Sequence, residues 1–350
     1  MSLAIVGIVV TTVPLLLLGI VSHGRWRLPL AAVLVAAAFA VAGSKGIVMV
    51  EDLWVLPLGI GMTDQLILLL MWCLLGSAAR AVGPVTLPGP TWLTALLMGA
   101  GMGEVPAATM LSLSAKTPKG AARLALTAAA GAMLGRLGDP AMLILLEGDP
   151  AATLAIVPLA VVLAVVVRPR AEDVHAWDGR FSVHHAALLA VILAACVPGL
   201  TLWAIAAGIG LFVFWSREEQ RPLELATPAW QLAALALAVL AIGGGAAEQA
   251  ALGLELSVEL LGDWAAPLLV GVTALLSALT DGLAMAVFCQ GIIDRSMSLD
   301  SILLVTPMTA GVAVGGLGPL IAAGAIKVGW RLWLLQVVVA MIWGWLWAIL

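Results

Sequence analysis

The sequence predicts an all-α polytopic membrane protein built from two inverted-topology repeats, and three observations predict it. The 350 residues are 63% hydrophobic and 10% charged, which is typical of multi-span membrane proteins and not of soluble ones. Apolar runs that are long enough to cross a bilayer follow one another, bounded by glycines, prolines and charges. Finally, an unusual pattern of an acid at a bend followed by a glycine-rich helix occurs once in each half.

The apolar runs predict about ten transmembrane helices. They cover residues 3–21, 28–43, 53–79, 121–147, 151–167, 184–198, 199–215, 228–247, 302–328 and 330–349. Two further apolar stretches, 90–114 and 264–290, are interrupted at mid-depth by Gly, Pro or an acid. We expect each of them to be a re-entrant helical hairpin that enters and leaves the membrane on the same side.

This order predicts three parts of the chain. Repeat 1 covers 1–167, with its hairpin at 90–114 and a broken helix at 121–147. A polar connector covers 168–183. Repeat 2 covers 184–350, with its hairpin at 264–290 and a broken helix at 302–328.

Matched spacing supports the repeat. Glu104 in the first hairpin and Asp281 in the second are 177 positions apart. The frame Gly135-x-Leu137-Gly138 returns 180 positions later as Gly315-x-Leu317-Gly318, with Pro140 and Pro319 close behind. A shorter correspondence pairs Asp64-Gln65 with Glu248-Gln249. Acids and broken backbone are costly inside hydrocarbon, so their occurrence twice at matched spacing indicates a transport site.

The basic residues predict the orientation in the membrane. With the N-terminus outside and both hairpins re-entrant, every Lys and Arg falls in a cytoplasmic segment except Lys45 and Arg295, which lie outside, and Arg136, which lies within a span. The outside stretch 250–267 carries acids and no base. We therefore expect a multi-pass protein of a prokaryotic cytoplasmic (inner) membrane, with the connector in the cytoplasm. The net charge of −4 gives no indication of a nucleic-acid partner.

Four short motifs have the positions of hairpin tips and helix breaks. Glu104-Val105-Pro106 and Thr280-Asp281-Gly282 are the expected tips, and Gly138-Asp139-Pro140 and Gly315-Gly316-Leu317-Gly318-Pro319 are the expected breaks. With the order of scaffold helices, hairpin and broken helix, these motifs resemble the ion transporter superfamily, in particular its arsenite-permease and sodium/proton-antiporter branches and a compact group of cation transporters within it. The tip asparagine of those families is replaced by Val105 and Gly282. The resemblance implies a secondary transporter, and it also implies a homodimer.

The candidate site residues offer the oxygen ligands and backbone groups that a hard cation such as sodium needs. They are Glu104, Asp281, Asp139, Gly138, Gly316, Thr109, Thr280 and Ser277, with Asp64, Glu248 and Arg136 as proton, ion or charge partners. Glu104, Asp281 and Asp139 are the expected sodium ligands. Buried acids can also carry protons, because burial raises the pKa of a carboxyl group.

Structural interpretations exist for several of these residues. Asp139 followed by Pro140 can simply begin a helix. Asp64 and Glu248 can be buried acids of the scaffold or can lie at helix ends in water. Thr and Ser hydroxyls in apolar helices often bond their own backbone.

We expect a secondary active transporter that exchanges a monovalent cation, most simply sodium, for protons by alternating access. One alternative is an anion carrier or efflux permease of the same fold, with Arg136 as the partner of an oxyanion or small carboxylate. Another is a non-transporting membrane subunit that serves as a scaffold. Nothing in the sequence matches a phosphate-binding loop, a nucleophile elbow or a metalloprotease helix, so no enzymatic activity and no cofactor beyond a bound sodium ion are expected.

Overall fold

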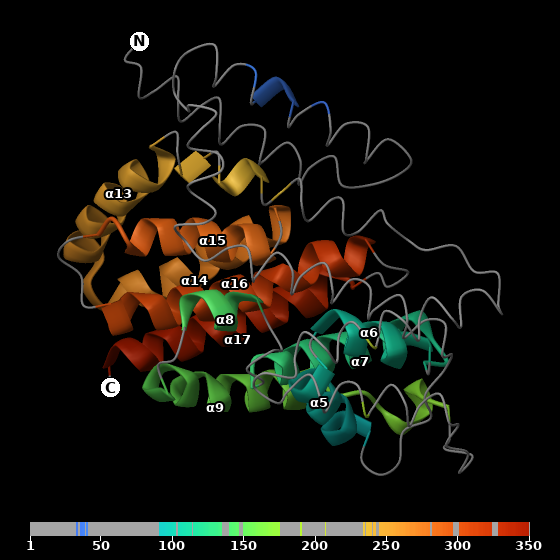
Figure 1. Cartoon of the computed structure of the whole chain (residues 1–350). Coiled ribbons are helices and arrows are strands. Elements are labelled where there is room, and N and C mark those ends of the chain that lie inside the picture. Colours follow the sequence, from blue (N-terminus) through green and yellow to red (C-terminus); the bar gives the residue numbers. More distant parts are fainter. Residues whose placement is uncertain are drawn as a thin grey trace.

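The computed structural model describes somewhat more than half of the chain. The described residues are 91–102, 104–113, 115–134, 140–146, 150–175, 245–280, 282–296, 301–323 and 328–349, with residues 33, 36–38, 40, 190, 207, 234, 236–239, 241 and 242. This part of the chain is helical apart from short turns and one isolated β-bridge between Ala115 and Val174, in agreement with the all-α prediction (Figure 1).

In the first half, the helices are α5 (Thr91–Met102), α6 (Glu104–Leu113), α7 (Pro118–Ala132), α8 (Pro140–Leu145) and α9 (Pro150–Val166), followed by the 3-10 turn η1 (Ala171–Asp173). In the second half, they are α13 (Ala246–Leu261), the 3-10 turn η2 (Gly262–Trp264), α14 (Ala265–Leu279), α15 (Gly282–Ile293), α16 (Ser301–Ala323) and α17 (Trp330–Ile349).

In the second half, α14 and α16 pack in parallel through glycines on α16. A Cβ atom on Gly311 would lie 2.5 Å from the carbonyl oxygen of Val270, and one on Gly315 would collide with the carbonyl oxygen of Ala274. Because the order of contacts is the same along both helices, they run in the same direction. Helix α15 lies between α14 and α16 in the chain, so it carries the chain back to the end of the bundle at which α14 began.

In the first half, the corresponding glycine also makes a close helix contact, but in the opposite sense. Gly131, 180 positions before Gly311, packs against the backbone of Leu96, and Gly99 packs against the backbone of Ala128. The order of contacts is reversed, so α5 and α7 run antiparallel. Each half thus has a close helix contact made through a glycine, but the two helices in contact run antiparallel in the first half and parallel in the second. The first bend was predicted at Glu104-Val105-Pro106, but these residues form the first turn of α6, where a proline fits because its missing N–H has no helical partner to lose. Residue 103, just before this helix, lies outside the described residues.

Helix breaks follow the prediction in one half only. The predicted helix 121–147 is divided into α7, which ends in a turn at Met133 and Leu134, and α8, which begins at Pro140. In contrast, α16 is helical without interruption from Ser301 to Ala323, so the predicted break at Gly315–Pro319 is not present. Instead, Gly315 lets α14 approach α16 closely, and Gly316 lets Gly282 do so. Such contacts require small residues but no break in the helix.

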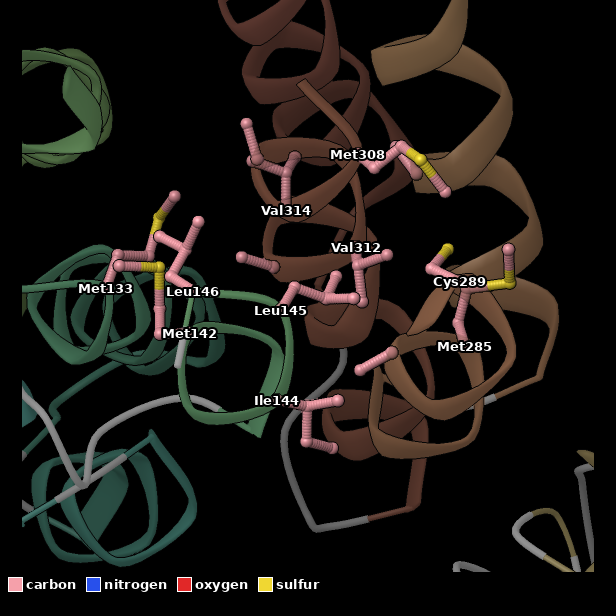
Figure 2. Close-up of a cluster of buried hydrophobic side chains, with 14 of the residues drawn as sticks. Met133, Met142, Ile144, Leu145, Leu146, Met285, Cys289, Met308, Val312 and Val314 are labelled. Carbon is pink, nitrogen blue, oxygen red and sulfur yellow. The ribbon is translucent and has the colours of Figure 1, made fainter. Parts of the chain in front are cut away.

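The two halves are joined by an apolar cluster around α8. This short helix packs against α15 and α16. Figure 2 shows Ile144 and Leu145 of α8 turned towards Met285 and Val312, which come from α15 and α16. The segment that follows the Gly138-Asp139-Pro140 motif therefore lies directly against the second hairpin.

Two described helical segments are long and apolar enough to cross a membrane, judged by length and composition: Ala246–Leu279 and Trp330–Ile349. They support a membrane location. The first has 34 residues, which would measure about 51 Å as one straight α-helix, more than a bilayer core requires. It bends at Gly262, whose φ of 52° is accessible mainly to glycine. The expected outside connection 250–267 is thus helical over most of its length.

The start of the connector is fixed to the beginning of α7. Lys116 N–H donates to the carbonyl oxygen of Asp173 (2.8 Å) beside the Ala115–Val174 bridge. The Arg123 guanidinium donates to Oδ2 of Asp173 at 2.9 Å, and the backbone N–H of Arg170 donates to the same oxygen at 2.9 Å. Burial of Asp173 opposes ionisation, but these hydrogen bonds and the two positive charges outweigh it and lower the pKa of the carboxyl group below its ordinary value of 3.8.

We expect Asp173→Asn to lower the free energy of unfolding by about 1–3 kcal/mol at pH 7, because the variant keeps the shape of the side chain but loses its charge-assisted bonds. A lowered pKa stabilises the fold above the ordinary value and ceases to do so as pH falls through the folded-state pKa. The difference from wild type should therefore persist at pH 5, begin to shrink near pH 3.8 and disappear as pH falls below the lower pKa of the folded state. Thermal unfolding in detergent measures it. Glu172→Gln is the control, because the Arg170–Glu172 ion pair is mostly exposed; an equal loss in both variants would contradict the prediction.

Candidate functional site

The candidate site is the turn between α14 and α15. Helix α14 ends at Leu279, and Thr280 leaves helical geometry with φ −106° and ψ −82°. Both the backbone N–H and the hydroxyl of Thr280 donate to the carbonyl oxygen of Leu276, at 3.0 and 2.8 Å. Because α15 begins at Gly282, only two residues separate the two helices. Two helices separated by this turn thus occupy the stretch 264–290, and its re-entry from one side of the membrane remains a prediction.

The turn lies against the middle of α16. A Cβ atom on Gly282 would lie 3.2 Å from Cα of Gly316, and one on Gly316 would lie 3.1 Å from Cα of Gly282. One turn earlier, the hydroxyl of Ser277 donates across the helix pair to the carbonyl oxygen of Val312 at 2.9 Å. The structure thus brings together three residues of the predicted site: Ser277, Thr280 and Gly316.

Buried hydroxyl groups continue from the turn along both helices. They belong to Thr273 and Ser277 on α14, to Thr280 in the turn, and to Thr306 and Thr309 on α16. Thr273, Thr280 and Thr309 donate to carbonyl oxygens of their own helices, as the structural interpretation expects, whereas Ser277 bonds a different helix. A hydroxyl that donates one hydrogen bond can still accept through its oxygen lone pairs. These groups therefore offer oxygen lone pairs inside the bundle.

The ends of the two helices add polar backbone at the turn. The last carbonyl groups of an α-helix and the first N–H groups of the next have no partners within their own helices. The carbonyl end carries partial negative charge and the N–H end partial positive charge. A turn of this kind can bind a small ion without any charged side chain.

Glu104 lies elsewhere in the bundle. It is the first residue of α6 and only 5% exposed. Its helix packs chiefly against α5 and α7. Convergence of Glu104 and the second hairpin turn on one cavity therefore remains a prediction, since the main contacts of α6 are with its own half.

The other predicted site residues are described only in part. Glu248 lies exposed in the first turn of α13, so of its two structural interpretations the helix-end acid is correct. An acid at that position is favoured by the helix dipole. Of Thr109, only the helical backbone is described. The remaining predicted site residues lie outside the described residues: Asp281, Asp139, Gly138, Asp64 and Arg136.

The sequence interpretation missed Gln336. This residue lies in α17 and is 0% exposed, and in the described part of the chain neither its amide nitrogen nor its amide oxygen has a hydrogen-bond partner. Buried polar groups are almost always paired, so such a residue needs an explanation. The signal was available, because Gln336 interrupts an otherwise apolar run of a predicted span.

Within the described residues, no group of three or more His, Cys, Asp or Glu side chains is placed to hold a metal ion. In comparisons with known proteins, the chain matches no family model and no curated protein.

Proposed function

We propose that this protein is a secondary active membrane transporter that exchanges a monovalent cation for protons. The observation that carries the proposal is the turn at Thr280–Gly282, which lies against Gly316 in the middle of a long helix, among buried hydroxyl groups. Exposed polar backbone is expensive inside an apolar bundle unless it binds something. Oxygen-rich turns at mid-depth are how transporters replace the hydration shell of a cation.

Apolar outer surfaces support the membrane part of the proposal. Helices α9, α13, α14 and α17 expose large hydrophobic side chains, among them Leu154, Val162, Leu256, Leu275 and Ile342. A surface of this kind suits lipid and not water. The contact of the 115–117 loop with the start of the connector also fits the proposed orientation, because both segments are assigned to the cytoplasm.

The proposed mechanism requires the acids to bind the ion and the proton in turn. Asp281, at the hairpin turn in the sequence, and Glu104, buried in the first half, are the proposed carriers of charge. A cation and a proton that compete for the same carboxylates are exchanged and not moved together. Movement of one hairpin-bearing unit against the rest of the bundle would expose the site to each side alternately.

The test is an exchange assay in proteoliposomes. A pH gradient is imposed, a pH-sensitive dye is enclosed, and sodium, lithium or potassium is added outside. We expect wild-type protein to release protons in response to sodium and Asp281→Asn to respond no more than protein-free vesicles do. The matched control is Asp263→Asn, since Asp263 is exposed in η2, and it should behave as wild type.

Two outcomes would overturn the proposal. Flux of an oxyanion or small carboxylate without any sodium-dependent proton movement would favour the anion carrier. Absence of every flux from well-folded protein, together with a partner that co-purifies, would favour the scaffold subunit.

A further inference from the structure

The buried side of α17 carries polar groups that the proposed site has not yet used. Gln336, Ala340 and Gly344 follow one another at intervals of four residues and are all buried, so they form one stripe. Gln336 offers a free amide N–H₂ and a free carbonyl oxygen within the described part of the chain. One turn earlier, the indole nitrogen of Trp333 is also buried without a partner among the described residues.

Contacts with α14 fix the depth of Gln336 in the bundle. A Cβ atom on Gly344 would lie 3.0 Å from Cγ2 of Val270 and 3.4 Å from Cα of Pro267, and one on Gly271 would lie 3.1 Å from the sulfur of Met341. The two helices therefore run antiparallel. Gln336 precedes Gly344 by eight residues, about 12 Å along the axis, which corresponds to eight residues beyond 267–270 on α14. This is the level of 275–278.

The layer at that level is the candidate site. Ser277 bonds Val312 there, and the α14–α15 turn begins at Thr280, one helical turn further along. Helix α17 packs against both α14 and α16, the two helices that meet in this layer. A buried amide whose two polar atoms have no partner among the described residues thus lies at the depth of the turn, on the stripe that faces those helices.

We propose that Gln336 is a neutral ligand of the transported cation, a role that rests on the proposed function. Its carbonyl oxygen binds the ion, as amide oxygens bind hard cations in proteins. An indole N–H cannot bind a cation, so Trp333 donates to an oxygen in the ion's own hydration shell. A neutral ligand strengthens cation binding without adding a charge that a proton would neutralise, so it favours the cation over the proton at the shared site.

This role predicts opposite changes in stability and transport. Gln336→Leu removes a buried amide that has no partner in the described part of the chain, so the thermal midpoint in detergent should stay the same or rise by about 2 °C. In the proteoliposome assay, the sodium concentration for half-maximal proton release should rise at least about tenfold, because a ligand is lost. Gln336→Glu keeps the oxygen and should retain sodium-dependent exchange, whereas a site that uses the amide as a donor to an anion would lose it. Gln290→Leu is the matched control, because the amide of Gln290 already donates to Asp294 at 2.9 Å near the end of α15. This variant should need the same sodium concentration as wild type for half-maximal proton release.

The outcomes separate this inference from the proposed function. If the wild type exchanges sodium and Gln336→Leu has the same half-saturation, Gln336 is not a ligand and the proposed function stands. The same conclusion follows if stability and transport of Gln336→Leu fall together, since a packing role predicts that. Loss of exchange in Gln336→Glu with normal stability also overturns the ligand role. If the wild type shows no exchange, both proposals fail.

Discussion

Gly315→Ala should disable the protein. The new methyl group would collide with the carbonyl oxygen of Ala274 and would lie 2.7 Å from Cβ of Ser277 and 2.8 Å from the carbonyl carbon of Ala274. Two of these atoms are backbone, so no change of rotamer relieves the contact, and α14 and α16 must separate. We expect a loss of about 3 kcal/mol or more of unfolding free energy, with loss of transport. Thermal unfolding in detergent and proteoliposome exchange measure the two effects.

Gly253→Ala is the matched control for this prediction. It is the same chemical change in the middle of α13, and a Cβ atom there meets nothing within 4 Å. Because alanine is the better helix former, this variant should be more stable by up to about 1 kcal/mol. The two substitutions should therefore change the unfolding free energy in opposite directions. If Gly315→Ala unfolds at the wild-type temperature, α16 does not pack on α14 at this depth, and the candidate site loses its framework.

The same glycines explain which part of the fold was predictable. Helices α9 and α17 lie within one residue of the predicted 151–167 and 330–349, because Pro150 and Gly329 punctuate long apolar runs. The turn at Thr280 was also predicted, since an acid and a glycine interrupt an apolar stretch there. The continuity of α16 was not, because a glycine that breaks a helix and a glycine that admits a neighbouring backbone look alike in a sequence.

The relative direction of packed helices was the second feature that could not be predicted from the sequence. The spacing that relates Gly131 to Gly311 is real, and both glycines contact the first limb of a predicted hairpin. Yet one contact is antiparallel and the other parallel, because periodicity fixes which face of a helix is packed and not the direction of its partner. Gln336 was missed for a related reason. The sequence shows a polar residue in an apolar run, but its burial without a partner among the described residues becomes visible only in the packed structure.

Glu104→Gln should abolish exchange while leaving the fold intact. Glu104 is 5% exposed in the first turn of α6, a helix that packs against α5 and α7. An acid at mid-membrane costs about 2.5–3.5 kcal/mol, so removing its charge should not destabilise the protein if binding is the reason for its burial. Glutamine keeps the shape and cannot exchange a proton. We expect proton release in response to sodium to fall to that of protein-free vesicles, with an unchanged or higher thermal midpoint.

Two further variants make this result decisive. Glu259→Gln, at an exposed position of α13, should exchange as wild type does and controls for the loss of one negative charge. Glu104→Asp keeps a titratable carboxylate on a shorter side chain and should retain part of the exchange. A thermal midpoint that falls in Glu104→Gln, with exchange reduced only in proportion to the folded protein, would assign Glu104 to the packing of the first half. The ion would then be bound by residues of the second hairpin alone. The repeat in the first half would contribute helices to the fold but no acidic ligand to the site.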